Sequence, residues 1–228
     1  IPLQEPEKAI MELQRCIHEL GMVGVQIGSN INGVNLSDES LFAVFEAAAD
    51  LGTAIFIHPW DIMGKENMEK YWLPWLVGMP AETSRAICSM IFGGVFERLP
   101  NLRVAFAHGG GSFPATAGRI QQGYDVRPDL CAVDNKVDPQ KYLGKFWVDS
   151  LVHDADALDF LIKKIEPIES SAGNEINIYY QNKRLTNFKD LKLNYNHRYY
   201  NRLLDNRTQL KDDIKDSLFR IFNFFKKV

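Results

Sequence analysis

Two short apolar runs, residues 54–58 (AIFIH) and 104–108 (VAFAH), both end in a histidine and decide how the chain is interpreted. Both are built from β-branched, aromatic and small apolar residues, without the polar alternation of a half-exposed strand. Continuous apolar runs of this length are typical of parallel strands buried on both faces. Pro59 and Trp60 follow the first run, and a glycine triplet at residues 109–111 follows the second. The sequence therefore predicts two buried parallel strands that each present an imidazole at the carboxyl end.

Helical and extended patterns alternate along residues 1–165. Strands are expected over residues 22–27, 53–58, 103–108 and 146–149. Helices are expected over residues 6–20, 80–100, 113–122 and 154–165, and between an N-cap at Ser37 and a stop at Gly52. The alternation predicts an α/β fold, a parallel sheet with right-handed helical crossovers. Four strand–helix units are half of an eight-stranded (β/α)8 barrel, or one small doubly wound sheet.

The bulk composition excludes several classes of protein. The net charge is −3, so no basic field points to nucleic acid, and no apolar run is long enough to suggest a membrane span. The three cysteines are widely spaced, which fits buried thiols in a reducing compartment, and we take the cytosol as the default location. The glycine-rich motifs of nucleotide-binding proteins and the GxSxG motif of serine hydrolases are absent.

The composition changes near residue 165, and we expect two regions, 1–165 and 166–228. Fifteen of the 16 glycines precede the change, and the net charge is −7 before it and +4 after it. The second region is rich in Asn, Tyr, Lys, Ile and Phe, the residues of A/T-rich codons. We interpret it as a non-homologous tail, poorly ordered or helical, with apolar residues at helical spacing over residues 214–225.

The two histidines are the main candidates for chemistry. His58 is a candidate metal ligand, because a rigid strand end fixes an imidazole well for zinc, although a buried hydrogen-bonded histidine is about as probable on sequence alone. His108 precedes three glycines, which let the backbone approach a ligand closely. That context favours a general acid-base role for His108 over a solvent-facing side chain.

Other candidates carry weaker signals. The guanidinium of Arg119 suits bidentate binding of a carboxylate, but most arginines are simply solvated. Trp60, Trp72 and Trp75 lie in a long segment between a strand and a helix. Such a segment can cover an active site, form a subunit contact or plug a barrel mouth. Asp149 lies near a strand end, but its spacing identifies no partner for it.

Several stretches together resemble the 2-amino-3-carboxymuconate-6-semialdehyde decarboxylase family, whose members are amidohydrolase-like (β/α)8 barrels. The resemblance rests on HPWD, YWLPWLVGMPAET and FAHGGG, with GVQIG and RPDLC in support. These lie at residues 58–61, 71–83, 106–111, 24–28 and 127–131. It runs over residues 1–165 and corresponds to the middle part of a family member.

The resemblance implies a function and a set of site residues. It implies that one carboxylate is removed as CO2 from a semialdehyde of the kynurenine pathway, which limits quinolinate formation, with Zn²⁺ as cofactor in a homodimer. By resemblance, His58 is a metal ligand, and His108 is the catalytic histidine that deprotonates water. Arg119 reaches into the partner subunit to hold a substrate carboxylate, and Trp75 lines the site.

The sequence also departs from the family pattern. The amino-terminal His-x-His ligand pair, an early substrate-binding arginine and the aspartate ligand of the last strand are absent. Only His58 remains of the four expected ligands, so we expect the chain alone to have little activity and poor solubility. A non-catalytic isoform or fragment that pairs with a full-length subunit, or another amidohydrolase-family metal hydrolase, are the alternative interpretations.

Overall fold

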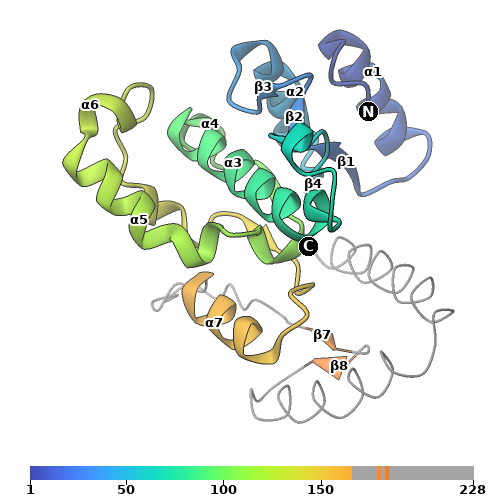
Figure 1. The fold of residues 1–228 in the computed structure, drawn as a ribbon. Coiled ribbons are helices and arrows are strands. Elements are labelled where there is room, and N and C mark those ends of the chain that lie inside the picture. The colour runs from blue at the N-terminus through green and yellow to red at the C-terminus, as the bar shows by residue number, and fades with distance from the viewer. Residues whose placement is uncertain (166–178, 181–182, 185–228) are drawn as a thin grey trace, which may run out of the picture. The chain divides into compact units, whose positions relative to one another are not determined.

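A computed structural model describes residues 1–165, 179–180 and 183–184 of the chain. The chain divides into two compact units, Ile1–Leu151 and Val152–Val228 (Figure 1). The first unit holds the main sheet and both candidate histidines. Within the described residues, no helix combines the length and apolar character needed to cross a membrane.

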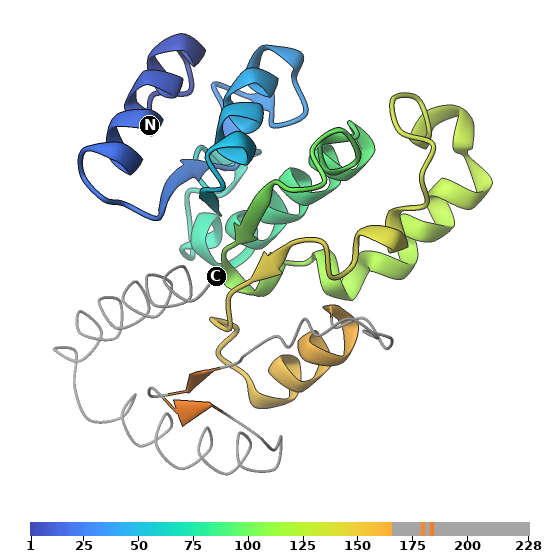
Figure 2. The same cartoon turned by 180° about the vertical axis from the view of Figure 1, so that it is seen from behind.

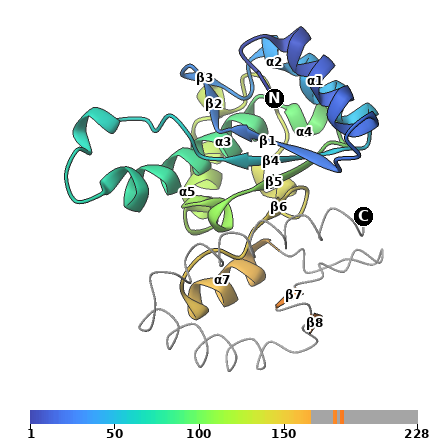
Figure 3. The same cartoon turned by 90° about the vertical axis from the view of Figure 1, so that its right-hand side faces the viewer.

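The main sheet has four parallel strands in the order β1-β4-β5-β6 (Figure 3). The strands are β1 (Gly24–Gly28), β4 (Ala54–His58), β5 (Arg103–Phe106) and β6 (Trp147–Val148). Each strand therefore lies beside the next one along the chain, with no reversal of the order at which a doubly wound sheet would bind its ligand. This order is that of a barrel segment, and it confirms the predicted partial (β/α) barrel.

The core lies between the sheet and its crossover helices. β4 is buried from Ala54 to Ile57, as expected for a central parallel strand. The helices are α1 (Pro6–His18), α2 (Glu39–Asp50), α3 (Met79–Phe92), α4 (Val95–Arg98), α5 (Phe113–Val126) and α6 (Pro128–Cys131). The view from behind brings the strands forward (Figure 2). The largest fully buried side chains include Phe45 of α2, Phe106 of β5 and Phe113 of α5.

Short elements complete the first unit. β2 (Asn30–Ile31) and β3 (Val34–Asn35) form a small antiparallel hairpin after β1. Single helical turns are η1 (Lys65–Asn67), the π-helical η2 (Pro74–Gly78), η3 (His108–Gly110) and η4 (Pro139–Tyr142). The first two interrupt the long segment between β4 and α3. The turn η3 follows β5 and contains His108.

Three local predictions were wrong. Asp38, and not Ser37, is the N-cap of α2, because the Asp38 carboxylate accepts a hydrogen bond from the Ser40 amide (3.0 Å). The helix expected over residues 80–100 is two helices, α3 and α4, because Gly94 adopts a left-handed φ of 70° between them. The strand expected to reach His108 ends at Phe106, and the chain turns into η3.

The second unit is described in part. α7 (Ala155–Ile165) confirms the helix expected over residues 154–165, and the carboxylate of Asp154 accepts a hydrogen bond from the Ala157 amide (2.6 Å), as an N-cap residue does. β7 (Tyr179–Tyr180) pairs with β8 (Lys183–Arg184) in an antiparallel register. The helical pattern over residues 214–225 lies outside the described residues.

Candidate active site at the strand ends

His58 and His108 lie side by side at the carboxyl edge of the sheet. β4 and β5 are adjacent and parallel, so their carboxyl ends meet at the same edge. The two imidazole ring centroids are 4.9 Å apart, and the rings meet edge to face at 75°. The carboxyl edge of a (β/α) barrel is where catalytic residues gather in this architecture. The structure thus brings together the two residues that the sequence singled out.

His58 is held in one tautomer by its own backbone. Its Nδ1 atom lies 3.1 Å from the carbonyl oxygen of Pro59. A carbonyl only accepts hydrogen bonds, so Nδ1 carries the proton and the neutral ring keeps its lone pair on Nε2. Burial lowers the pKa of His58 below the usual 6.5, against weaker raising effects from the Pro59 carbonyl and the Asp149 charge. The neutral imidazole with a free Nε2 lone pair is the form that binds a metal ion.

His108 sits in a turn that requires glycine around it. His108 itself has a φ of 57°, and Gly110 and Gly111 follow in the same half of conformational space, at 79° and 63°. A Cβ atom on Gly111 would lie 2.3 Å from the Pro80 carbonyl oxygen, and one on Gly110 would lie 3.1 Å from a methyl group of Val148. The triplet therefore lets the turn pack directly against α3 and β6, a close approach that side chains would prevent.

Ser112, which precedes α5, joins the His108 turn to α3. The Ser112 hydroxyl makes no cap hydrogen bond to α5. It pairs instead with the hydroxyl of Ser84 on α3 (2.8 Å), and its amide donates to the Pro80 carbonyl (3.1 Å). The turn that carries His108 is thereby tied to the first turns of α3.

Asp149 is a site residue that sequence reasoning left without a role. It directly follows β6, and its carboxylate accepts hydrogen bonds from the Gly109 amide (2.9 Å) and the Leu151 amide (3.0 Å). Its charge also acts on His58, where it raises the pKa. The available signal was its position after the expected strand over residues 146–149. That signal was weak, because an acidic residue at a strand end is common and its partners lie far away in the sequence.

The aromatic segment between β4 and α3 is exposed. The rings of Trp72 and Trp75 stack in parallel, with centroids 4.5 Å apart and an angle of 5° between their planes. Trp60 is 71% exposed, Trp72 66% and Trp75 39%. The segment thus presents a stacked aromatic surface, and its role as a cover, a subunit contact or a plug of the barrel mouth stays a prediction.

Arg119 lies on α5, and its side chain is exposed. An arginine at the surface of its own chain can reach a site in another chain, so its predicted role in a partner subunit stays a prediction.

The described residues fit one ligand position of a metal site and not a complete one. Among them, no group of three or more His, Cys, Asp or Glu side chains could hold a metal ion. His58 has the correct tautomer and burial for a ligand, but a single imidazole does not make a tight site. The remaining ligands of a metal centre would have to come from elsewhere.

Comparison with known proteins places the fold. A family model described as amidohydrolase matches residues 1–167. The chain belongs to the amidohydrolase family. The family resemblance drawn from the sequence is confirmed by the 2-amino-3-carboxymuconate-6-semialdehyde decarboxylase of Dictyostelium discoideum, which is 67% identical over 175 residues. That match covers 77% of this chain and 49% of the relative, so the chain spans about half the relative's length.

Solved structures of decarboxylases are also similar to this chain. The 5-carboxyvanillate decarboxylase LigW of Sphingomonas paucimobilis is 27% identical, with a TM-score of 0.65, over 72% of this chain and 50% of that one. The related LigW2 of Novosphingobium aromaticivorans, in a mutant form with bound manganese, is 25% identical with a TM-score of 0.65 and the same coverage. A decarboxylase with a similar fold therefore binds a divalent metal.

Proposed function

We propose that this chain carries part of the active site of a metal-dependent, non-oxidative decarboxylase. The proposed substrate is 2-amino-3-carboxymuconate 6-semialdehyde, and the proposed product is 2-aminomuconate 6-semialdehyde, a step of the kynurenine pathway that limits quinolinate formation. The observation that carries the proposal is the pair of imidazoles, 4.9 Å apart, at adjacent strand ends of a chain with 67% identity to such a decarboxylase.

Decarboxylation requires two things of the protein, namely transfer of a proton and charged groups placed near the substrate. When the C–C bond to the carboxylate breaks, CO2 leaves. The electron pair of the broken bond stays on the substrate carbon, which then takes up a proton. His108 is the group proposed to move that proton, since its imidazole stands at the strand edge beside His58. Zn²⁺ is proposed as the metal, bound through Nε2 of His58 and through ligands from outside the described residues.

The remaining assignments follow the resemblance. Arg119 is proposed to hold a substrate carboxylate across a homodimer interface, and Trp75 to line the site. The guanidinium fork matches a carboxylate, and it lies at the surface of its own chain. We further propose that residues 1–165 form the partial barrel, that residues 166–228 are a non-homologous tail, and that the protein is cytosolic.

A chimera would test the function. Residues 1–165 would replace the matching stretch of the Dictyostelium discoideum relative, and turnover would be followed by decay of the semialdehyde absorbance. We expect zinc-dependent turnover that drops by about 10³-fold in His108→Ala, the scale on which acid–base groups contribute. Normal zinc content without turnover would overturn the proposal. The 228-residue chain assayed alone should hold little metal and show little activity, because only one ligand is described.

The described residues contain no group of side chains that could hold a metal ion, and this favours a second candidate function. The chain would then be a non-catalytic form that pairs with a complete subunit. Co-expression of the chain with the complete relative tests this. Stable co-purification with reduced turnover per complete subunit supports pairing, and separate elution of the two chains excludes it.

A further inference from the structure

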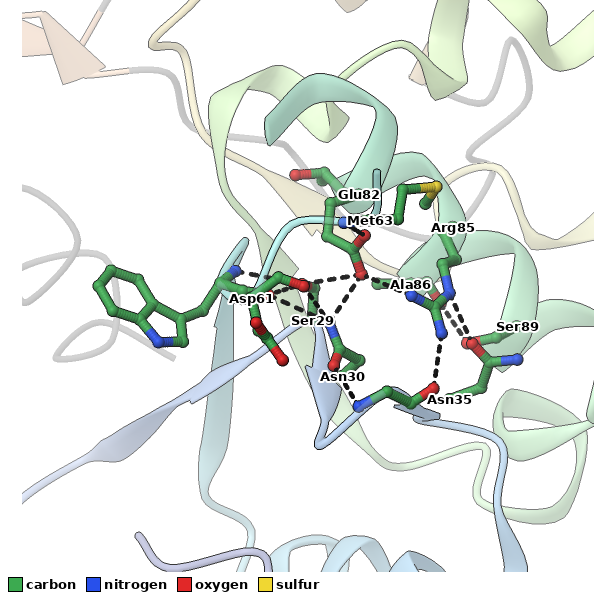
Figure 4. A network of polar contacts seen from close by, with 12 residues as sticks. Ser29, Asn30, Asn35, Asp61, Met63, Glu82, Arg85, Ala86 and Ser89 are labelled. Carbon is green, nitrogen blue, oxygen red and sulfur yellow. Dashed lines mark hydrogen bonds and ion pairs between the residues drawn. The ribbon is translucent and has the colours of Figure 1, made fainter. Parts of the chain in front are cut away.

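Glu82, on α3, is a charged side chain enclosed within the first unit. Its side chain is 0% exposed. Burying a carboxylate is costly unless hydrogen-bond donors replace the lost water. Donors surround it: Oε1 accepts from Asn30 (2.9 Å), Arg85 (3.2 Å) and Ser29 (3.4 Å), and Oε2 accepts from the backbone amide of Met63 (3.2 Å) (Figure 4). A cluster this complete defines the positions of every segment that contributes to it.

The cluster around Glu82 also hydrogen-bonds the backbone of residues 60–63, which follow His58. The Asn30 amide group also donates to the carbonyls of Trp60 (3.1 Å) and Asp61 (3.2 Å). The Ser29 hydroxyl lies 3.2 Å from both the amide and the carbonyl of Trp60. Figure 4 shows that the backbone of Asp61 and Met63 lies beside Asn30 and Glu82. The backbone between Trp60 and Met63 is therefore hydrogen-bonded at three residues, Trp60, Asp61 and Met63, by side chains of one cluster.

One of these bonds reaches His58 through a single peptide unit. The amide of Trp60 donates to Ser29, and the carbonyl on the same peptide bond, that of Pro59, accepts from Nδ1 of His58 (3.1 Å). Because a peptide unit is planar and rigid, fixing its N–H also fixes the direction of its C=O. The acceptor that selects the tautomer of His58 is thus held by the cluster around Glu82.

The opposite edge of the cluster secures α3 itself. The guanidinium of Arg85 bonds Glu82 and also the carbonyl of Gly33 (2.8 Å) and the side chain of Asn35 (2.8 Å) in the β2–β3 hairpin. The helix that carries Glu82 is consequently anchored against the hairpin, and the same helix end binds the His108 turn through Pro80 and Ser84.

We propose that Glu82 is a positioning residue for His58. Its buried carboxylate holds Ser29, Asn30 and Met63, fixes the Pro59–Trp60 peptide plane, and so keeps the proton of His58 on Nδ1 and its lone pair on Nε2. The consequence for catalysis, that Nε2 is the atom presented to a metal, rests on the proposed function. The tautomer and the peptide plane do not.

Glu82→Gln is the most direct test. A carboxamide has the same shape but only one acceptor, so one of its ends must place N–H groups against the donors that Glu82 now accepts. In the 228-residue chain we expect His58 to change from the Nδ1–H tautomer to a mixture of tautomers in long-range ¹H–¹⁵N spectra. The Trp60 and Met63 amides should exchange with solvent about tenfold faster, the effect of one lost hydrogen bond.

Two further variants keep the test decisive. Ser29→Ala removes only the hydroxyl that joins Glu82 to the Trp60 amide, and it should shift His58 in the same direction even if Glu82→Gln fails to fold. Asn135→Ala is the matched control, because this buried amide donates to Ile91 at the other end of α3 (2.8 Å). It should destabilise the fold and leave the His58 spectrum unchanged.

The outcomes are distinct. An unchanged His58 tautomer and unchanged Trp60 exchange in folded Glu82→Gln or Ser29→Ala overturn the proposal, as does an equal shift in Asn135→Ala. No metal or substrate is needed for these spectra, so the positioning role can stand if decarboxylation fails, and can fail if decarboxylation stands.

Discussion

The turn after β4 and the turn after β5 both present a histidine at the sheet edge, and they are held by different means. The turn after β4 is bound by side chains, those of Glu82, Asn30 and Ser29, which hydrogen-bond its backbone. The turn after β5 depends mainly on glycine, because glycines with positive φ let its backbone pack closely against α3 and β6. Both turns converge on the same helix, α3. The difference shows that a rigid imidazole can be obtained from a polar cluster or from close backbone packing.

Gly111→Ala should have the largest effect, because it attacks the packing on which the second turn depends. A Cβ atom would meet the backbone oxygen of Pro80 at 2.3 Å, and the residue has a φ of 63°. Strained backbone and overpacking together cost about 4 kcal/mol. Urea unfolding followed by tryptophan fluorescence would measure the loss. Gly33→Ala is the control, since its φ is also positive, at 83°, but nothing lies within 4 Å, and about 1 kcal/mol is expected. Equal losses in the two variants would mean that close packing is not what holds the turn.

Asp149 makes a side-chain hydrogen bond to the backbone of the second turn. Asp149→Ala removes the acceptor of the Gly109 amide and should cost about 1.5 kcal/mol in the free energy of unfolding. Asp149→Asn keeps an acceptor oxygen and should recover most of that loss. Both variants should lower the pKa of His58 further, because the charge that raises it is gone. An NMR titration of the His58 ring would show this, and a rise in that pKa would contradict the geometry.

The sequence was sufficient for the elements that depend on local patterns. The apolar runs before His58 and His108 predicted β4 and β5. Glu82 could not be found in this way, because in the sequence it is an ordinary acidic residue in the first turn of a helix. Its partner Asn30 is 52 positions away. Polar clusters of this kind depend on which segments meet in space, and single-residue patterns carry no information about that.

The same limit explains the smaller errors. Ser37 and Asp38 are both good N-caps, and only the hydrogen bond to Ser40 decides between them. The strand β6 is only two residues long. The role of Asp149 as an acceptor depends on the register between β5 and β6, which cannot be predicted from so short a strand.

The burial of His58 predicts a pH dependence of a smaller size. A folded-state pKa below 6.5 means that the unfolded chain binds this proton more tightly. The free energy of unfolding should therefore fall as the pH drops from above 6.5 through the lower folded-state pKa. His58→Gln should reduce that slope in urea titrations between neutral and acidic pH, whereas His18→Gln, at the end of α1, should leave the His58 part of it in place. An unchanged slope in His58→Gln would show that the ring is not desolvated.

The smallest effect belongs to the aromatic segment beyond the first turn. Trp72 and Trp75 stack on each other, but both are exposed, so their contact should couple by about 0.5 kcal/mol, the low end for aromatic pairs. A double-mutant cycle with Trp72→Ala and Trp75→Ala, read from urea unfolding, would measure that coupling. Exposed stacking of this size orients a surface and adds little stability to the fold. Coupling several times larger would mean that the segment is part of the core. The contrast between the hydrogen-bonded turn after β4 and the exposed aromatic segment that follows it would then be wrong.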